Sequence, residues 1–212
     1  MEFLPTLPVL LAFSLAGLAL ALTPGPDMTL FFSRTIAQGP VAGVVSLMGA
    51  SCGCLIHTLA AVLGISALLV ASPAAFWVLK IVGASYLLWL AFQAIAHGST
   101  FRLNKTTGAV APLRNFLMGA GINILNPKVV IFFMTFLPQF VSVSDPYALQ
   151  KMLFLGIYFI VLTTPLLALV IVISGKFIYR LEQNPKITRV IDYIFGSIFA
   201  VFAVKIIFTE AR

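Results

Sequence analysis

The sequence is poor in charged residues, and this shortage indicates the class of protein. Only 9% of the 212 residues are Asp, Glu, Lys or Arg, whereas 61% are hydrophobic and the mean hydropathy is +1.10. Soluble domains carry about 25% charged residues, so this composition lies far outside their range. The apolar stretches leave no room for a soluble domain between them. We therefore expect an all-α integral membrane protein that forms a single transmembrane domain over residues 1–212.

The chain also lacks the residue sets on which most enzymes and metal sites depend. It has two cysteines and two histidines, and no Cys-x-x-Cys motif, His-Glu-x-x-His motif or Ser/His/Asp set. Cys52 and Cys54 are two positions apart, so on a helix they point to opposite sides and cannot form a disulfide or hold one ion together. We expect two reduced cysteines, no catalytic activity, no cofactor and no metal site. The net charge is +7, but the basic residues are not interleaved with aromatic residues, so we expect no nucleic-acid partner.

Long apolar runs are what the chain has in excess. Runs of about 18 or more apolar residues predict membrane-spanning helices. Six such helices are expected, at residues 5–38, 41–70, 74–97, 113–142, 147–176 and 188–208. The first residues, Met1-Glu2-Phe3, lack the basic stretch of a signal peptide, so the first helix is expected to be retained.

Basic residues are concentrated in alternate connections between the expected helices. The connections after the first, third and fifth helices hold Arg34, Arg102, Lys105, Arg114, Lys176, Arg180, Lys186 and Arg189. The positive-inside rule places these connections in the cytoplasm, which puts both termini outside. Three helices in each half then require residues 113–212 to enter the membrane upside down relative to residues 1–97, with 98–112 as the cytoplasmic connection.

Two prolines and a glycine interrupt the first expected helix. In Thr23-Pro24-Gly25-Pro26, each proline removes a backbone donor and biases the preceding residue away from the α region. In lipid, such a break is tolerated only where the freed backbone groups are buried in protein or line a wet cavity. Asp27 follows at mid-membrane depth, where a charge costs about 2.5–3.5 kcal/mol and is usually kept for a function.

A second break lies in the fourth expected helix, at Asn126-Pro127-Lys128. Aligning Pro26 with Pro127 places Asp27 over Lys128, so a charge follows the break in both halves. Paired interruptions of this kind indicate the binding site of a transporter built from inverted repeats. Two unpaired mid-membrane charges would cost roughly 5–7 kcal/mol, comparable to the stability of a domain. We therefore expect Asp27 and Lys128 to meet each other or a ligand.

Asp27 and Lys128 allow two interpretations. A zwitterionic amino acid carries the matching charges, an ammonium for Asp27 and a carboxylate for Lys128. The helix halves that begin after each break would add positive dipole ends for the carboxylate, and unwound carbonyls would accept from the ammonium. The alternative is a permanent Asp27–Lys128 ion pair that only holds the two halves together.

The second expected helix carries Gly49, Gly53 and His57 at four-residue spacing. Small residues at this spacing let another helix approach closely, so the glycines indicate packing. An imidazole in a membrane helix usually faces a cavity or a polar partner. His57 is therefore either a proton carrier or a structural hydrogen-bonding group.

The fourth expected helix is unusually polar on one face. Asn115, Gly119 and Asn123 follow one another at four-residue spacing and lead into Asn126. The amides either bind across to neighbouring helices or line the same cavity as the break, and the sequence leaves both open.

These motifs together resemble the lysine-exporter (LysE/RhtB) family of amino-acid efflux proteins. The resemblance covers the whole chain, and it is carried by Thr23-Pro24-Gly25-Pro26, the Gly-x3-Gly-x3-His pattern, Gly83 with Tyr86-Leu87, and Asn126-Pro127-Lys128. Within the family the chain is most similar to the threonine/homoserine exporter branch. The resemblance implies a multi-pass protein of the bacterial inner membrane, an antiporter that exports amino acids and is driven by the proton-motive force.

The expected substrate site follows from the breaks and from this resemblance. Its residues are Asp27, Lys128, Asn126, Asn123, Pro24, Gly25, Pro26 and Pro127, with His57 and Asp27 as candidates for proton coupling. The expected partners are a small-molecule amino acid, threonine- or homoserine-like, and the lipid bilayer, while a homodimer stays open. The alternative function is a metal or inorganic-cation transporter of related architecture, against which the single mid-membrane carboxylate argues.

Overall fold

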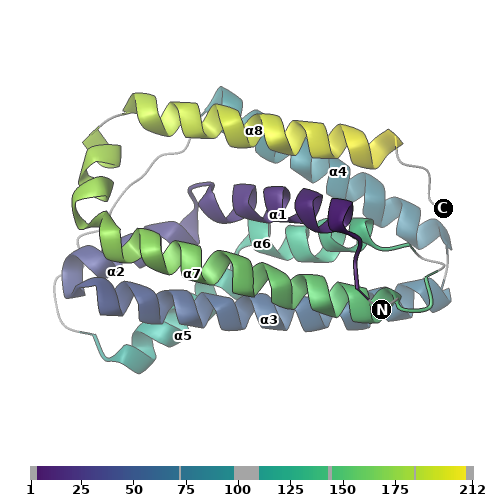
Figure 1. Ribbon diagram of the computed structural model, residues 1–212, viewed down its shortest axis with the longest axis horizontal. Coiled ribbons are helices and arrows are strands. Elements are labelled where there is room, and N and C mark those ends of the chain that lie inside the picture. The colour runs from purple at the N-terminus through teal and green to yellow at the C-terminus, as the bar shows by residue number, and fades with distance from the viewer. Residues whose placement is uncertain (1–3, 72, 98–109, 143–144, 184, 209–212) are drawn as a thin grey trace.

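The computed structural model describes residues 4–71, 73–97, 110–142, 145–183 and 185–208, and within these ranges the only regular elements are helices (Figure 1). They are α1 (Leu7–Leu22), α2 (Pro26–Gln38), α3 (Pro40–Ala71), α4 (Pro73–Ala96), α5 (Pro112–Leu125), α6 (Pro127–Ile131), a π-helical segment (Phe132–Phe136), a 3-10 segment (Leu137–Phe140), α7 (Ala148–Gln183) and α8 (Pro185–Phe208).

Prolines set many of the helix boundaries. Six of the α-helices begin on a proline, whose missing N–H has no intrahelical partner at that position in any case and whose fixed φ suits the first helical turn. The end of α2 uses a glycine instead. Gly39 has a φ of +88°, a conformation that residues with a side chain rarely adopt, and it turns the chain directly into Pro40 of α3.

The helices form an elongated bundle (Figure 1). α4 packs against α8 along one side, while α3 packs against α2, α5 and α7 on the other, and α1 and α6 lie between these groups in the view. The pair α1 and α2 runs from right to left in Figure 1, whereas α5 and α6 run from left to right. α1 begins and α8 ends at the same, right-hand end of the bundle.

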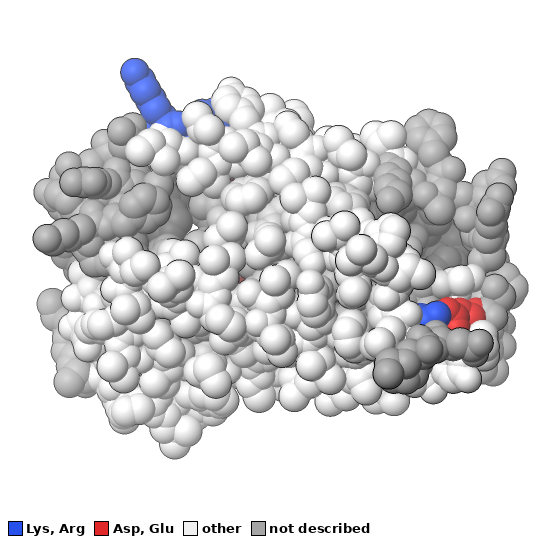
Figure 2. All heavy atoms as spheres, in the orientation of Figure 1, with Lys and Arg blue, Asp and Glu red and all other residues white. Residues whose placement is uncertain are grey.

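Several helices have the length and composition of membrane spans. Among the described residues, Pro40–Gly64 and Ala148–Ile173 are long and apolar enough to cross a bilayer by themselves. Two further spans are obtained if α1 with α2, bent by 55°, and Pro112–Leu125 with Pro127–Phe140, bent by 57°, each count as one. The described apolar part of α4, Ile81–Ala96, is shorter than a full span. The face shown in Figure 2 is almost free of charged side chains between its two ends, as expected for a surface in lipid.

Small residues bring α3 and α5 into close contact. A Cβ on Gly49 would lie 1.9 Å from the carbonyl oxygen of Phe116, and a Cβ on Gly119 would lie 1.9 Å from that of Ser46. A Cβ on Gly53 would lie 2.5 Å from Oδ1 of Asn123. The glycines of α3 therefore serve packing, as their spacing predicts, and Gly53 also leaves the space that Asn123 occupies.

An aromatic cluster holds the segment that follows the second break. Phe132, Phe133 and Phe136 are almost completely buried. The ring of Phe132 contacts Phe13 of α1 and Phe159 of α7, and the ring of Phe133 also contacts Phe159. Buried aromatic pairs contribute about 0.5–1.5 kcal/mol each beyond the area they bury. The cluster therefore fixes the chain on the far side of the break to two helices that border the site.

Candidate functional site

The ammonium of Lys128 donates hydrogen bonds to backbone carbonyls at the first break. Its Nζ donates to the carbonyl oxygens of Leu20, at 3.0 Å, and Thr23, at 2.8 Å. In an unbroken helix the N–H of residue 24 would bond to the Leu20 carbonyl, but Pro24 has no N–H. Carbonyls at the end of α1 thus receive donors from the other half of the chain. The absence of a side chain at Gly25 makes room, since a Cβ there would lie 3.3 Å from Nζ.

The carboxylate of Asp27 is held by amides at the second break. Its Oδ2 accepts from Nδ2 of Asn123, at 3.1 Å, and from Nδ2 of Asn126, at 3.0 Å. Oδ1 of Asn126 accepts in turn from the backbone N–H of Lys128, at 3.1 Å, and so caps α6. Oδ1 of Asp27 is buried and has no hydrogen-bond partner.

Each charge therefore contacts the opposite break, and the structure shows no ion pair between Asp27 and Lys128. Whether the two charges bind substrate or only hold the halves together stays a prediction, but in this structure they do not pair directly. The reason is geometric: freed carbonyls attract the ammonium and side-chain amides attract the carboxylate, so each charge is solvated locally by the other half of the chain. Asn123 and Asn126 bind across to α2, and Asn123 also lines a small cavity beside Asp27, so both of the roles predicted for these amides are present.

His57 takes part in the same network. It is 5% exposed, and its Nε2 donates to the carbonyl oxygen of Asn123 at 3.3 Å. That carbonyl has lost the donor it would have in an unbroken helix, because Pro127 has no N–H; it also accepts from the backbone of Asn126 at 3.1 Å. The imidazole stacks on Phe133, with ring centroids 5.9 Å apart. The structure thus gives His57 a structural bond, and its role in proton transfer stays a prediction.

The cysteines are both free. Cys52 is exposed, whereas Cys54 is buried with its Sγ 3.6 Å from Oδ1 of Asn123. This agrees with the prediction that the two side chains point apart.

A cavity of about 690 Å³ lies beside the first break, toward α4 and α8. It is lined by Thr23, Pro24, Gly25, Pro26, Thr29, Leu30, Ser33, Arg34, Trp89, Leu90, Gln93, Ala94, His97, Met118, Ile122, Lys128 and Phe199. A second cavity, of about 50 Å³, faces α3 and α7, and Asp27 and Asn123 line it. Lys128 lines both.

Comparisons with known proteins identify the family of the chain. A family model described as LysE type translocator matches residues 18–210. The chain belongs to this family. Its members are transporters rather than enzymes, which confirms that no catalytic activity is to be expected.

Relatives of this translocator align along nearly their whole length. It is 29% identical to the uncharacterized membrane protein YrhP of Bacillus subtilis (strain 168), over 92% of this chain and 97% of the relative. It is 28% identical to a homoserine/homoserine lactone efflux protein of Salmonella typhimurium, over 89% and 90% of the two chains. It is 24% identical to a leucine efflux protein of the same organism, over 92% of each. No solved structure matches the chain.

The two cavities of the translocator differ in what they can hold. A volume of 690 Å³ lies in the range of small-molecule sites, whereas 50 Å³ suffices for one or two waters. Of the predicted substrate-site residues, Lys128 and the Pro24–Pro26 segment line the large cavity. Asp27 and Asn123 border the small one, and neither cavity is lined by Asn126, Pro127 or His57.

Sequence reasoning missed the face of α2 that lines the large cavity. It assigned Arg34 to a cytoplasmic connection, but the side chain lies inside α2 and is 5% exposed. The lining residues of α2 recur at helical spacing: Pro26, Thr29, Leu30, Ser33 and Arg34. The polar members of this set, Thr29, Ser33 and Arg34, could have been recognised in the sequence, but Arg34 was counted only as a positive charge that marks a cytoplasmic connection.

Proposed function

We propose that this chain is a secondary transporter that exports a neutral amino acid across the bacterial inner membrane. The observation that carries the proposal is the cavity of about 690 Å³, which adjoins the unwound Pro24–Pro26 segment and the ammonium of Lys128. A broken helix beside a substrate-sized cavity is the arrangement by which many transporters bind charged groups of their substrates. The printed names of two relatives, leucine efflux protein and homoserine/homoserine lactone efflux protein, favour the same class of substrate.

The charges around the large cavity favour a neutral side chain. Arg34 and Lys128 line it, and none of its described lining residues is Asp or Glu. A lysine or arginine substrate would place its side-chain cation in a cavity that already holds two positive charges, which is unfavourable in a medium of low dielectric. Leu30, Leu90 and Ile122 offer apolar contacts for an aliphatic side chain.

Opposite directions of the two broken pairs support an inverted-repeat architecture. In this proposal six spans form one domain over residues 1–212, with repeats at 1–97 and 113–212 joined by 98–112. The reversed courses of α1–α2 and α5–α6 in Figure 1 are what such repeats require. The basic connections then place both termini outside.

For proton coupling we favour Asp27 over His57. Oδ1 of Asp27 is buried without a partner, and the carboxylate borders a cavity that can hold water. His57 bonds to the same Asn123 that contacts Asp27. The hydrogen bond of His57 can therefore change when Asp27 is protonated, without His57 itself gaining or losing a proton.

A metal or inorganic-cation transporter is less well supported. Among the described residues, no group of three or more His, Cys, Asp or Glu side chains is placed to hold a metal ion. The large cavity is also lined by two cations, which would repel a metal ion.

Purified protein in proteoliposomes tests the proposal. Labelled leucine, homoserine, threonine, lysine and a divalent metal ion are loaded inside, and efflux is followed with and without an imposed pH gradient. We expect neutral amino acids to leave faster in the presence of the gradient. Export of the metal ion alone, or of none of the five, would contradict the proposal.

The coupling residue is tested by comparing exchange with gradient-driven efflux. Asp27→Asn can keep one accepting oxygen for the amides but cannot bind and release a proton. We expect it to retain exchange of substrate across the membrane while losing acceleration by a pH gradient. His57→Gln, which can still donate to the Asn123 carbonyl, should keep both activities. Loss of gradient-driven efflux in His57→Gln with normal exchange would transfer the role to His57.

A further inference from the structure

Arg34 is a buried cation whose hydrogen-bonding capacity is mostly unused. Its side chain is 5% exposed, yet Nε and Nη1 are buried without a partner. The remaining nitrogen, Nη2, lies 3.1 Å from Sδ of Met118, and a thioether is only a weak acceptor. A guanidinium stays protonated in proteins, so Arg34 cannot lower the cost of burial by losing its charge.

The surroundings of this guanidinium indicate what it lacks. Arg34 lines the large cavity together with Lys128, and none of the described lining residues carries a negative charge. A buried charge without an acceptor is strongly unfavourable unless a ligand supplies the counter-charge. The guanidinium presents parallel N–H donors whose spacing matches a carboxylate, so a planar carboxylate is the group that would satisfy Nε and a terminal nitrogen together.

Lys128 is less available for this purpose than Arg34. An ammonium has three donors, and two of those on Lys128 bond to the carbonyls of Leu20 and Thr23. Arg34 lies two helical turns beyond Pro26, or roughly 12 Å further along α2, at a distance from the break. The cavity is therefore lined by two cations, of which Arg34 has more N–H groups free to bind an anion than Lys128 has.

We propose that Arg34 binds the α-carboxylate of the exported amino acid, at a station in the large cavity that is separate from Lys128. The inference rests on the proposed function, since it assigns a group of the substrate to a residue that the broken-helix motifs do not include. The substrate carboxylate is held by the fork of Arg34, and the aliphatic side chain lies against Met118 and Ile122. Release then requires transfer of the carboxylate toward the remaining donor of Lys128.

Binding to the purified protein in nanodiscs tests this assignment. Titrations use L-leucine and L-leucinamide, which keeps the ammonium and the side chain but has no carboxylate. Wild type should bind leucine more tightly than leucinamide. Arg34→Gln should weaken leucine binding roughly tenfold to a hundredfold and bind the two compounds about equally. Arg114→Gln removes the same charge from an exposed position on α5 and should behave as wild type.

Stability measurements keep the test independent of folding defects. Arg34→Met replaces an unsatisfied cation by an apolar side chain beside Met118, so the ligand-free variant should unfold at the same or a higher temperature than wild type. It should also lose the stabilisation that leucine gives to wild type. A clear fall in the unfolding temperature of ligand-free Arg34→Met would show that Arg34 is structural and would overturn the proposal.

Other outcomes separate the possible sources of the anion. If Arg34→Gln binds leucine as wild type does but loses bound anionic lipid when nanodiscs contain phosphatidylglycerol, the guanidinium holds a lipid phosphate and the proposal is wrong. If wild type exports neutral amino acids in proteoliposomes while Arg34→Gln keeps full preference for leucine over leucinamide, only this inference fails. If wild type transports no amino acid, the proposed function itself fails.

Discussion

A side chain can replace the backbone donors that a proline removes. Lys128 does this for the end of α1, and His57 does it for the carbonyl of Asn123. In lipid an unsatisfied carbonyl costs several kcal/mol, because no water is present to bond to it. The polar residues near the breaks are thus as much a part of the backbone's hydrogen bonding as of any site for substrate.

The charge-swapped double variant distinguishes this account from an ion pair. In Asp27→Lys with Lys128→Asp, a carboxylate at position 128 has no hydrogen to donate to the Leu20 and Thr23 carbonyls. We expect the double variant to be no more stable than Lys128→Met, with a loss of about 3–5 kcal/mol from the buried groups left unpaired. Thermal unfolding in detergent, together with efflux at matched expression, measures the effect. Recovery of wild-type stability by the swap would show that the two charges pair directly.

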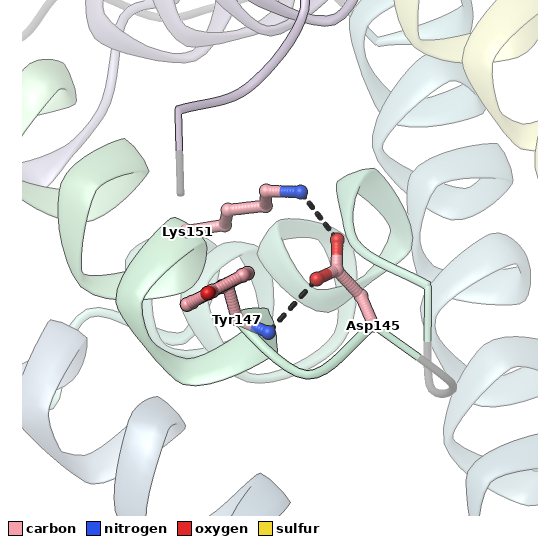
Figure 3. Close-up of polar contacts among 3 residues, drawn as sticks. All are labelled: Asp145, Tyr147 and Lys151. Carbon is pink, nitrogen blue, oxygen red and sulfur yellow. Dashed lines mark hydrogen bonds and ion pairs between the residues drawn. The ribbon is translucent and has the colours of Figure 1, made fainter. Parts of the chain in front are cut away.

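The start of α7 offers a titratable pair outside the apolar segments. Oδ2 of Asp145 bonds to Nζ of Lys151, and its Oδ1 accepts from the backbone N–H of Tyr147 at 2.8 Å (Figure 3). The bond from Lys151 and then that from Tyr147 favour the charged carboxylate, so they hold the pKa of Asp145 below its usual 3.8. Through these two bonds the carboxylate stabilises the turn that leads into α7.

The stabilisation from Asp145 should depend on pH. A carboxyl group with a lowered pKa in the folded state stabilises the fold above its unfolded pKa, and this contribution is lost as the pH falls through the folded pKa. Asp145→Asn should therefore unfold at a lower temperature than wild type at pH 7, and the two should converge as the pH falls below 3.8. Lys151→Met keeps the Tyr147 bond and should show a smaller difference. A gap between Asp145→Asn and wild type that is equal at pH 7 and pH 3 would contradict this explanation.

At the site, the sequence predicted which residues gather but not how they pair. The two breaks made Asp27, Lys128, Asn123 and Asn126 candidates, and the structure brings all four together. Direct pairing of the charges was one of two open interpretations, since opposite charges attract strongly in a low dielectric. The structure shows no direct pair, because the prolines free carbonyls close to the lysine, and the positions of such acceptors depend on the three-dimensional course of the chain.

At the scale of helices, glycine determines how closely α3 and α5 approach. Gly49 and Gly119 each face a backbone carbonyl of the other helix, so the contact is backbone against backbone. The same contact carries Asn123 to Asp27, because Gly53 leaves space for the asparagine side chain. The packing of α3 on α5 thus positions a residue of the candidate site.

Two alanine substitutions on α5 test this contact with a matched control. A Cβ at position 119 would lie 1.9 Å from the Ser46 carbonyl oxygen, so Gly119→Ala must push the helices apart. We expect it to destabilise the protein by about 1–3 kcal/mol or more and to weaken efflux. A Cβ at Gly121 meets nothing within 4 Å, so Gly121→Ala should stay within about 1 kcal/mol of wild type. The unfolding temperatures of the two variants measure this difference. Equal losses of stability in Gly119→Ala and Gly121→Ala would show that the close contact between α3 and α5 is unimportant.

Helix boundaries were predicted best where prolines mark them. The breaks at Pro24–Pro26 and at Pro127 were placed correctly, because proline acts locally whatever the surroundings. The π-helical and 3-10 segments from Phe132 to Phe140 were not predicted. They depend on how the aromatic cluster packs against α1 and α7, and the spacing of apolar residues in the sequence does not predict that packing.

At the scale of the whole molecule, broken and unbroken helices divide the roles. The long helices α3 and α7 cross the bundle and present apolar surfaces, whereas the broken pairs meet in the interior with their charges. Such a division suits a transporter, because a site formed by helix ends can exchange hydrogen bonds when one half moves relative to the other. Under the proposed inverted-repeat architecture, the large and small cavities are the two regions that such a motion would open and close.

The orientation of the bundle in the membrane can be tested at both of its ends. α7 begins at the right-hand end of Figure 1 and α5 at the left-hand end, so residues that precede them should lie on opposite sides of the bilayer. The basic connections assign the end that carries Arg114 to the cytoplasm. In a Cys52→Ser background, which removes the exposed thiol and leaves the buried Cys54, Tyr147→Cys should react with an impermeant maleimide added to intact cells. Arg114→Cys should react only after the membrane is permeabilised, and a reporter fused after Arg212 should be active only outside. The reverse labelling would invert the proposed orientation, and labelling of both cysteines from the same side would contradict the placement of α5 and α7 at opposite ends.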